Sequence, residues 1–313
     1  MSYIPISDNA VRQVIDATTV FTEFRRIQAQ AQPYAGTMYW KREGVYEYLV
    51  KTRPRRRSQE RLGARSDKTE HIFAEFSLRK EALEARLKSI REALTEAERL
   101  NKAVKAGRTP NLVVALLNVL EDAGLSQHFT VVGTHALYAY ESAASVRVMS
   151  GALATQDVDL LRDARRRVQF MTDIEGLNAS MLSVLQRADP SFERKEGQNE
   201  TAINAKGFEV DFLRRQPIED DPHPFRFTAD EGDLWPVQAV RASVLTSAPR
   251  FEHAVISVSG RMALMRTIAP TTFVEFKRWM AEKALHREEA KRRRDRLQAN
   301  IVQELLDQKL LLP

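Results

Sequence analysis

Two stretches decide how the centre of the chain folds: Val-Val-Gly-Thr-His at residues 131–135 and Ala-Thr-Gln-Asp-Val-Asp-Leu-Leu at residues 154–161. The first predicts a buried strand that ends in a Gly-Thr turn before a helix. The second predicts another strand, in which successive side chains point to opposite faces. Asp157 and Asp159 therefore lie on one face, and the apolar residues beside them point into the core.

Adjacent carboxylates repel each other unless a cation lies between them. A hard divalent ion with oxygen ligands satisfies them best, and Mg²⁺ is the usual one beside phosphates. Asp211, within Phe-Glu-Val-Asp-Phe-Leu at 208–213, lies on a strand face opposite its apolar neighbours. It could complete the metal site or accept a proton from an attacking hydroxyl. The alternative is that each acid is an ordinary surface residue of a strand.

Gly133 and Thr134 predict a phosphate site, because a strand-to-helix turn points backbone N–H groups at an anion and Gly permits close approach. The alternative is an ordinary turn with Thr134 as a helix cap. Lys277 lies in the middle of an apolar helical stripe near the C-terminus. Such a Lys either reaches solvent or has a buried anionic partner, and a triphosphate would be suitable.

The composition is that of a globular protein, with 43% hydrophobic and 29% charged residues among 313. The 48 basic and 42 acidic residues leave a net charge of +6, which permits a polyanionic partner. The absence of cysteine excludes disulfides, thiolate zinc sites and cysteine nucleophiles. No apolar run has the length of a signal peptide or a membrane span, so we expect a cytoplasmic protein with no membrane contact.

The chain divides into three predicted parts: an N-terminal domain at 1–110, a central domain at 111–265 and a C-terminal helical segment at 266–313. In the first part we expect a helix at 9–30, a β-hairpin at 34–51 and a long helix that starts near Asp67. The long helix carries an apolar seam with Asn101 as its polar interruption. The seam's partner is either the first helix or a second subunit, which would make a homo-oligomer.

The central part predicts an α+β fold with a mixed sheet whose acids share one face. Its expected helices are at 112–121 and 174–187. Its expected strands are at 129–132, 154–161, 191–194, 201–205, 208–213, 237–247 and 254–258, with an irregular segment at 216–235. The chain beyond Pro270 is expected to be helical.

Two basic segments could hold nucleic acid. Arg53–Arg65 carries six arginines against one acid beside the aromatic hairpin, so it could bind a phosphate backbone while a ring stacks on a base. The alternative is a solvated loop. The C-terminal basic helix at 287–296 has the same two interpretations, ligand contact or a solvated face.

The order of these motifs resembles the DNA polymerase β-type nucleotidyltransferase superfamily, and within it the bacterial GSU2403-type nucleotidyltransferase-fold proteins. The resemblance rests on residues 131–141, 154–161 and 208–213, and the hairpin and Phe-Val-Glu-Phe-Lys-Arg-Trp-Met at 273–280 are similar too. Lys277 and the later Arg-Arg-Asp295 are also similar to AbiEii-type toxins, which implies an antitoxin as a further partner.

The resemblance implies that Asp157 and Asp159 hold two Mg²⁺ ions, with Asp211 completing the site and activating the acceptor hydroxyl. Gly133 and Thr134 would bind the β- and γ-phosphates of an NTP, and Lys277 would be a second phosphate contact. The reaction would transfer a nucleoside monophosphate to an RNA or tRNA end, a small molecule or a protein, and release pyrophosphate. The alternative is a catalytically idle nucleic-acid-binding or toxin-antitoxin module on the same fold.

Overall fold

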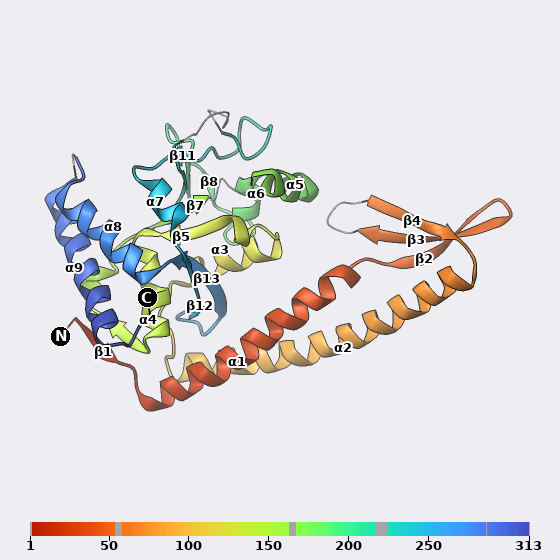
Figure 1. The fold of residues 1–313 in the computed structure, drawn as a ribbon, viewed down its shortest axis with the longest axis horizontal. Coiled ribbons are helices and arrows are strands. Elements are labelled where there is room, and N and C mark those ends of the chain that lie inside the picture. The colour runs from red at the N-terminus through yellow and green to blue at the C-terminus, as the bar shows by residue number, and fades with distance from the viewer. Residues whose placement is uncertain (1, 54–57, 163–166, 217–224, 286, 313) are drawn as a thin grey trace.

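The structure, a computed structural model, describes residues 2–53, 58–162, 167–216, 225–285 and 287–312. Figure 1 shows an N-terminal part that projects from a larger rounded part. We call residues 8–103 the arm and the rest of the described chain the main body. The chain starts on the main body, where β1 (Tyr3–Pro5) pairs antiparallel with β6 (Val146–Val148).

Two antiparallel helices form the shaft of the arm, α1 (Asp8–Ala31) and α2 (Asp67–Ala103). Each begins at a serine whose hydroxyl accepts a backbone N–H, which satisfies a donor that the helix itself leaves free. Ser7 caps α1, and Ser66 forms a capping box with Thr69 at the start of α2. The predicted helices are confirmed, and the start signal near Asp67 lies where the helix begins.

The seam of α2 packs against α1, so the first helix is the partner that the structure shows for it. Asn101, its polar member, is buried and fully engaged. It accepts a hydrogen bond from Gln13 of α1 at 3.0 Å and donates one to the carbonyl of Gly260 at 3.1 Å. This polar residue therefore joins both arm helices to the main body.

The far end of the arm carries an antiparallel sheet, which we call the arm sheet. Its strands, in the order β2-β3-β4, are β2 (Met38–Glu43), β3 (Tyr46–Arg53) and β4 (Ser58–Ala64). The predicted hairpin is confirmed, with Gly44 at φ +62° in its turn. The predicted loop at Arg53–Arg65 is wrong for β4, which pairs with β3. Arg55, Arg56 and Arg57 lie outside the described residues.

Across the described residues of the main body, a mixed sheet of eight strands forms the centre, which confirms the α+β fold. The strand order is β12-β13-β5-β7-β10-β9-β8, and β11 pairs with β10. β7 and β10 are parallel neighbours, whereas β5 runs antiparallel to β7. The strands are β5 (Phe129–Val132), β7 (Asp157–Arg162), β8 (Glu193–Arg194), β9 (Thr201–Ile203), β10 (Glu209–Arg214), β11 (Val237–Gln238), β12 (Arg250–Ile256) and β13 (Met262–Ile268).

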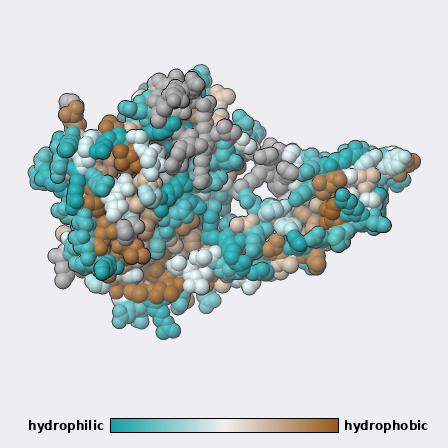
Figure 2. All heavy atoms as spheres, viewed as in Figure 1, coloured by the Kyte–Doolittle hydropathy of each residue, from teal (hydrophilic) through white to brown (hydrophobic). Residues whose placement is uncertain are grey.

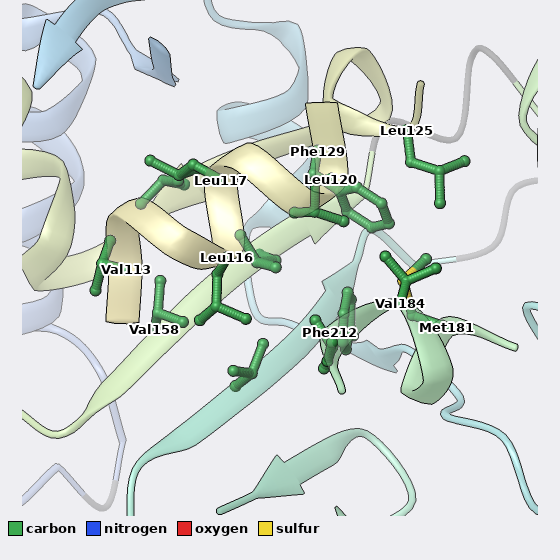
Figure 3. Close-up of a cluster of buried hydrophobic side chains, with 14 of the residues drawn as sticks. Val113, Leu116, Leu117, Leu120, Leu125, Phe129, Val158, Met181, Val184 and Phe212 are labelled. Carbon is green, nitrogen blue, oxygen red and sulfur yellow. The ribbon is translucent and has the colours of Figure 1, made fainter. Parts of the chain in front are cut away.

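One face of this sheet packs against α3 (Asn111–Asp122), α5 (Arg167–Leu177) and α6 (Met181–Leu185). Figure 3 shows Leu116 of α3 directed at the strands that carry Val158 and Phe212. Because α3 is apolar along most of its length, it can bury itself between the sheet and α6.

The opposite face is covered by α4 (Ala136–Ala143), α7 (Ala242–Ser247), α8 (Pro270–Glu282) and α9 (Glu289–Asp307). Alternation along β7 assigns Leu160 to the α3 side and Leu161 to the α9 side. The main body therefore has three layers, and the face toward α4, α8 and α9 receives every second residue of β7.

Several predicted elements differ from the structure. The helix expected at 174–187 is two helices, separated where Asn178 adopts φ +47° and Ser180 caps α6. The strand expected at 237–247 is limited to β11, after which α7 begins, and β13 was not predicted. In the predicted irregular segment at 216–235, residues 217–224 lie outside the described residues.

Among the described residues, no helix combines the length and apolar character needed to cross a membrane. Figure 2 shows mostly hydrophilic residues on the visible face of the arm, with hydrophobic residues in small groups among them.

Candidate active site

Asp157, Asp159 and Asp211 meet at the ends of two adjacent parallel strands. β7 supplies Asp157 and Asp159, and Asp211 of β10 lies in register beside Asp159. One carboxylate oxygen from each lies within 4.8 Å of the others, and no other group of His, Cys, Asp or Glu in the described chain has this spacing. The predicted face is confirmed, because both acids of β7 point to the side covered by α4, α8 and α9. We call these residues the Asp cluster.

The Asp cluster carries negative charge that Lys277 and Arg287 offset only in part. Asp159 keeps some exposed surface, but protein atoms crowd its carboxylate. Desolvation, together with repulsion from Asp157 and Asp211, raises the pKa of Asp159 to about 7. Burial also raises the pKa of Asp211, against the opposing effect of a hydrogen bond donated by Thr201 at 2.6 Å. The carboxylate oxygens and their mutual repulsion fit a divalent cation.

The Gly-Thr turn lies directly beside Asp159. β5 pairs with β7 so that Val132 is opposite Asp159, and the chain then turns through a 3₁₀ segment at Gly133–His135 into α4. Gly133 has φ +70°, and a Cβ there would lie 2.2 Å from Oδ2 of Asp159. Only Gly fits, both because of the left-handed backbone and because of this contact.

Thr134 is buried, and its hydroxyl accepts a hydrogen bond from Nε2 of Gln298 at 3.0 Å. The same Nε2 donates to the carbonyl of Ala152 at 2.7 Å, in the segment that leads into β7. Gln298 lies on α9 and is fully buried. One α9 side chain therefore holds the Gly-Thr turn and the approach to the Asp cluster together.

Lys277 of α8 is buried beside the Asp cluster, and its nearest anionic partner is in α9. Its Nζ lies 2.9 Å from Oδ1 of Asp295, which also pairs with Arg287 at 2.7 Å. Burial lowers the pKa of Lys277, while Asp295 and then Asp159 oppose that shift. Of the two alternatives for this Lys, the buried anionic partner is the one observed, and a contact with nucleotide stays a prediction.

His135, the last residue of the Gly-Thr turn, is also buried beside the site. Desolvation lowers the pKa of His135 to about 4, although the negative charge of Asp157 and a backbone hydrogen bond with this residue oppose the shift. The imidazole is therefore neutral at physiological pH. It packs between the rings of Tyr138 and Phe208 at centroid distances of 5.7 and 6.1 Å.

A comparison with protein families gives a match over residues 111–313, to the family described as nucleotidyltransferase. This stretch holds the Asp cluster, the Gly-Thr turn and the Lys277–Asp295 pair. The chain belongs to this nucleotidyltransferase family. No curated protein and no solved structure matches the chain. The family establishes a transferase enzyme that uses an NTP, and its members generally use a divalent metal, which the Asp cluster could hold.

The predicted site residues of this nucleotidyltransferase come together in the main body. Gly133, Asp157, Asp159 and Asp211 converge at the ends of β5, β7 and β10, with Thr134 and Lys277 behind them. The segment Arg53–Arg65 is not part of this group, because Arg61 lies on the arm sheet and Arg65 directly follows it. The C-terminal basic helix contributes through its inward side only, and its exposed Arg296 pairs with Glu289.

Sequence reasoning noticed Asp295 through the resemblance, but it missed Gln298 and the way in which α9 supports the site of the nucleotidyltransferase. Arg294, Asp295 and Gln298 face inward from a helix whose basic composition indicated solvent. Arg294 donates to the carbonyl of Ala154 at 2.6 Å, just before β7. A signal was available, since Asp295 and Gln298 are one helical turn apart beside the apolar residues Ala299 and Val302.

Proposed function

We propose that this nucleotidyltransferase transfers a nucleoside monophosphate from an NTP to a hydroxyl acceptor in a Mg²⁺-dependent reaction. The observation that carries the proposal is the Asp cluster, whose carboxylates converge and repel one another in the absence of a cation. Bound Mg²⁺ would stabilise negative charge on the attacking and leaving oxygens. Asp157 and Asp159 would hold two such ions, and Asp211 would share in their coordination.

Asp211 is proposed to take the proton of the acceptor hydroxyl. The acceptor oxygen then forms a bond to the α-phosphorus as the bond to the bridging oxygen breaks, and pyrophosphate leaves. The position of Asp211 beside Asp159 supports this role, because an acceptor hydroxyl at the metal site would lie close to its carboxylate. Thr201 would hold the carboxylate in place through its 2.6 Å hydrogen bond.

Gly133 and Thr134 are proposed to bind the β- and γ-phosphates. Their position beside Asp159 supports this, because phosphates bound to the turn would share oxygens with the metal site. Lys277 is proposed as a more distant phosphate contact, since it interacts electrostatically with Asp159 while Asp295 holds its ammonium group in place.

The motif order further supports placing the chain in the GSU2403-type branch of the polymerase β-like superfamily, related to AbiEii-type toxins. The acceptor would then be an RNA or tRNA end, a small molecule or a protein. Nucleic acid, an antitoxin or a second copy of the chain would be its macromolecular partners. The net charge of +6 favours RNA among the acceptors.

Transfer can be tested with α-³²P-labelled NTPs, Mg²⁺ and either total RNA or cell lysate. We expect label to enter one class of acceptor, and Asp157→Asn or Asp159→Asn to abolish the transfer. Asp16→Asn, a change at an exposed position of α1, is the matched control and should leave labelling unchanged. Thermal unfolding of each variant shows whether it is folded.

Labelling that survives both substitutions in folded protein would refute the metal-site assignment. A catalytically idle nucleic-acid-binding or toxin-antitoxin module would instead show no transfer with any NTP. In that case calorimetry would detect no Mg²⁺-dependent NTP binding, while RNA or DNA would bind with a steep dependence on salt.

A further inference from the structure

The outer face of the arm sheet is rich in tyrosine and in cations. Tyr46 and Tyr48 lie on the same face of β3, two residues apart. The residues between and after them point the other way, toward α2, where Lys51 lies 5.2 Å from the ring centroid of Phe76. On β2, Trp40 likewise packs against Phe73 of α2 at 6.0 Å. The tyrosine face therefore points away from the shaft.

Neighbouring strands add cations to this face. Lys41 of β2 is in register with Tyr48, and Arg61 of β4 lies over the Tyr48 ring with its guanidinium 3.1 Å from the centroid. Lys41 and Arg61 share one acid, Glu43, at 3.0 Å each, so the group keeps a net positive charge. Tyr46 is 62% exposed, and its ring lies 6.4 Å from that of Tyr48.

The positive charge of the whole chain is concentrated in this unit. Residues 38–65 contain nine Lys and Arg residues against three Glu, a net charge of +6. The complete chain also has a net charge of +6. Acids and bases therefore balance over the remaining residues. The segment 38–65, of which Arg55, Arg56 and Arg57 lie outside the described residues, is the part of the sequence that complements a polyanion.

We propose that the outer face of the arm sheet binds single-stranded nucleic acid. Bases stack on Tyr46 and on the Arg61 guanidinium that covers Tyr48, and Lys41 and Arg61 contact the flanking phosphates. A single strand fits because its base faces are free to meet an aromatic ring, whereas a duplex hides them within its stack.

The bound strand is the acceptor of the transfer reaction, a step that rests on the proposed function. Figure 1 shows the arm sheet at the far end of the shaft from the sheet that carries the Asp cluster. The arm sheet therefore holds a part of the acceptor remote from its reacting hydroxyl, and it contributes to acceptor affinity without touching the reacting atoms.

Binding is measured on the full chain by fluorescence anisotropy, with labelled oligomers of about 12 nucleotides. The probes are single-stranded U-rich RNA, the same length of dT, and a duplex. We expect both single strands to bind at least tenfold more tightly than the duplex. With two phosphate contacts, from Lys41 and Arg61, an increase from 50 to 200 mM salt should raise the Kd for single strands roughly sevenfold. The comparison of RNA with dT shows which sugar is preferred.

Substitutions distinguish the contribution of ring stacking to affinity from the contribution of charge. Tyr46→Ala and Tyr48→Ala should each raise the Kd about fivefold to 100-fold, whereas Tyr46→Phe should retain affinity because the ring remains. Arg61→Gln should lower the salt slope by about 0.7. Arg296→Gln, at an exposed arginine of α9, is the matched control and should change neither quantity. Circular dichroism confirms that each variant is folded.

The proposal is overturned if the double variant Tyr46→Ala/Tyr48→Ala binds the single strands as tightly as the wild type. It is also overturned if light scattering shows that the wild type is a dimer and that the double variant is a monomer, because the face would then be an interface between copies of the chain. Asp157→Asn distinguishes the two proposals. This variant should bind the probes with the affinity of the wild type. If the wild type fails to bind the probes but still transfers nucleotide, the proposed binding surface alone is wrong. If the wild type binds the probes but does not transfer nucleotide, the proposed chemistry alone is wrong.

Discussion

The fold places Asp159 in an environment that disfavours its ionised carboxylate. β7 and β10 bring Asp157 and Asp211 to its carboxylate, and Gly133 is packed against Oδ2. In the folded protein without metal, this carboxylate takes up a proton at a pH where an exposed acid is already ionised. The repulsion that destabilises the metal-free fold is the same property that would favour cation binding.

The pH dependence of the free energy of unfolding should report the raised pKa of Asp159 directly. Because the pKa of Asp159 is raised in the folded state, its contribution to the free energy of unfolding is present at low pH and is lost as pH rises from about 4 to 7. Asn cannot ionise, so Asp159→Asn should be more stable than the wild type at pH 8 in EDTA, by about 1 to 3 kcal/mol, and similar at pH 4. Thermal unfolding at both pH values measures this.

Added Mg²⁺ should raise the Tm of the wild type at pH 8 and leave that of Asp159→Asn nearly unchanged. Equal pH profiles for the two proteins without metal would show that Asp159 ionises normally, contrary to this expectation.

At the scale of elements, α9 acts as the support of the candidate active site. Its inward side chains engage three segments that are far apart in the sequence: the Gly-Thr turn, the approach to β7 and Lys277 of α8. Because these contacts are made by buried polar groups, the position of α9 determines the position of the turn.

Gln298→Met tests this support, because Met has a similar length and fills the buried space but cannot donate to Thr134 or Ala152. The loss of two hydrogen bonds should raise the Kd for the NTP, measured by calorimetry in Mg²⁺, about fivefold to 30-fold. Gln303→Met on the same helix removes a hydrogen bond to the exposed Asp307, and it should leave the Kd for the NTP unchanged. A lower Tm with unchanged NTP affinity would assign Gln298 a role in folding only.

Local patterns predicted much of the fold and the centre of the site. Alternation along a strand was enough to place Asp157 and Asp159 on one face, and the motif order brought in Asp211. Serine and glycine signals located the arm helices and the hairpin turn. These inferences succeeded because each depends on neighbours in the sequence.

The rest depends on contacts between distant segments. The partner of Lys277 could not be chosen before α8 and α9 were placed side by side, and the same holds for Gln298 and Thr134. β4 was read as a loop because its arginines indicated solvent, although Arg61 and Arg65 find partners on the strands and helix around them. At residues 242–247 the helix and strand preferences are similar, and packing decides.

At the scale of the whole molecule, the buried carboxylate of Glu141 links the arm to the main body through ion pairs. Glu141 of α4 is 2% exposed, and it pairs with Arg108, in the link between α2 and α3, and with Arg147 of β6. Arg147 in turn donates to the carbonyl of Ala106, just beyond the end of α2. The end of the arm is therefore tied to a helix beneath the central sheet.

Glu141→Gln should weaken this junction strongly, because it leaves two arginines without their buried anion. We expect the free energy of unfolding in urea to fall by about 3 to 5 kcal/mol. Glu289→Gln, which removes an exposed acid that pairs with Arg293 and Arg296, should change it by less than about 0.5 kcal/mol. A loss for Glu141→Gln no larger than that of the control would show that the junction is held by other contacts.

The concentration of net charge in residues 38–65, of which 54–57 lie outside the described part of the chain, also makes the molecule electrically asymmetric. The residues outside 38–65 carry no net charge, and Figure 1 shows β2, β3 and β4 at the extreme end of the long axis. In the field of a polyanion the protein experiences a torque that turns the arm sheet forward before contact. Collisions with the polyanion are thereby oriented, and salt slows the encounter because it screens this torque. The Asp cluster, which lies in the main body, stays outside the region where the field of the polyanion is strongest.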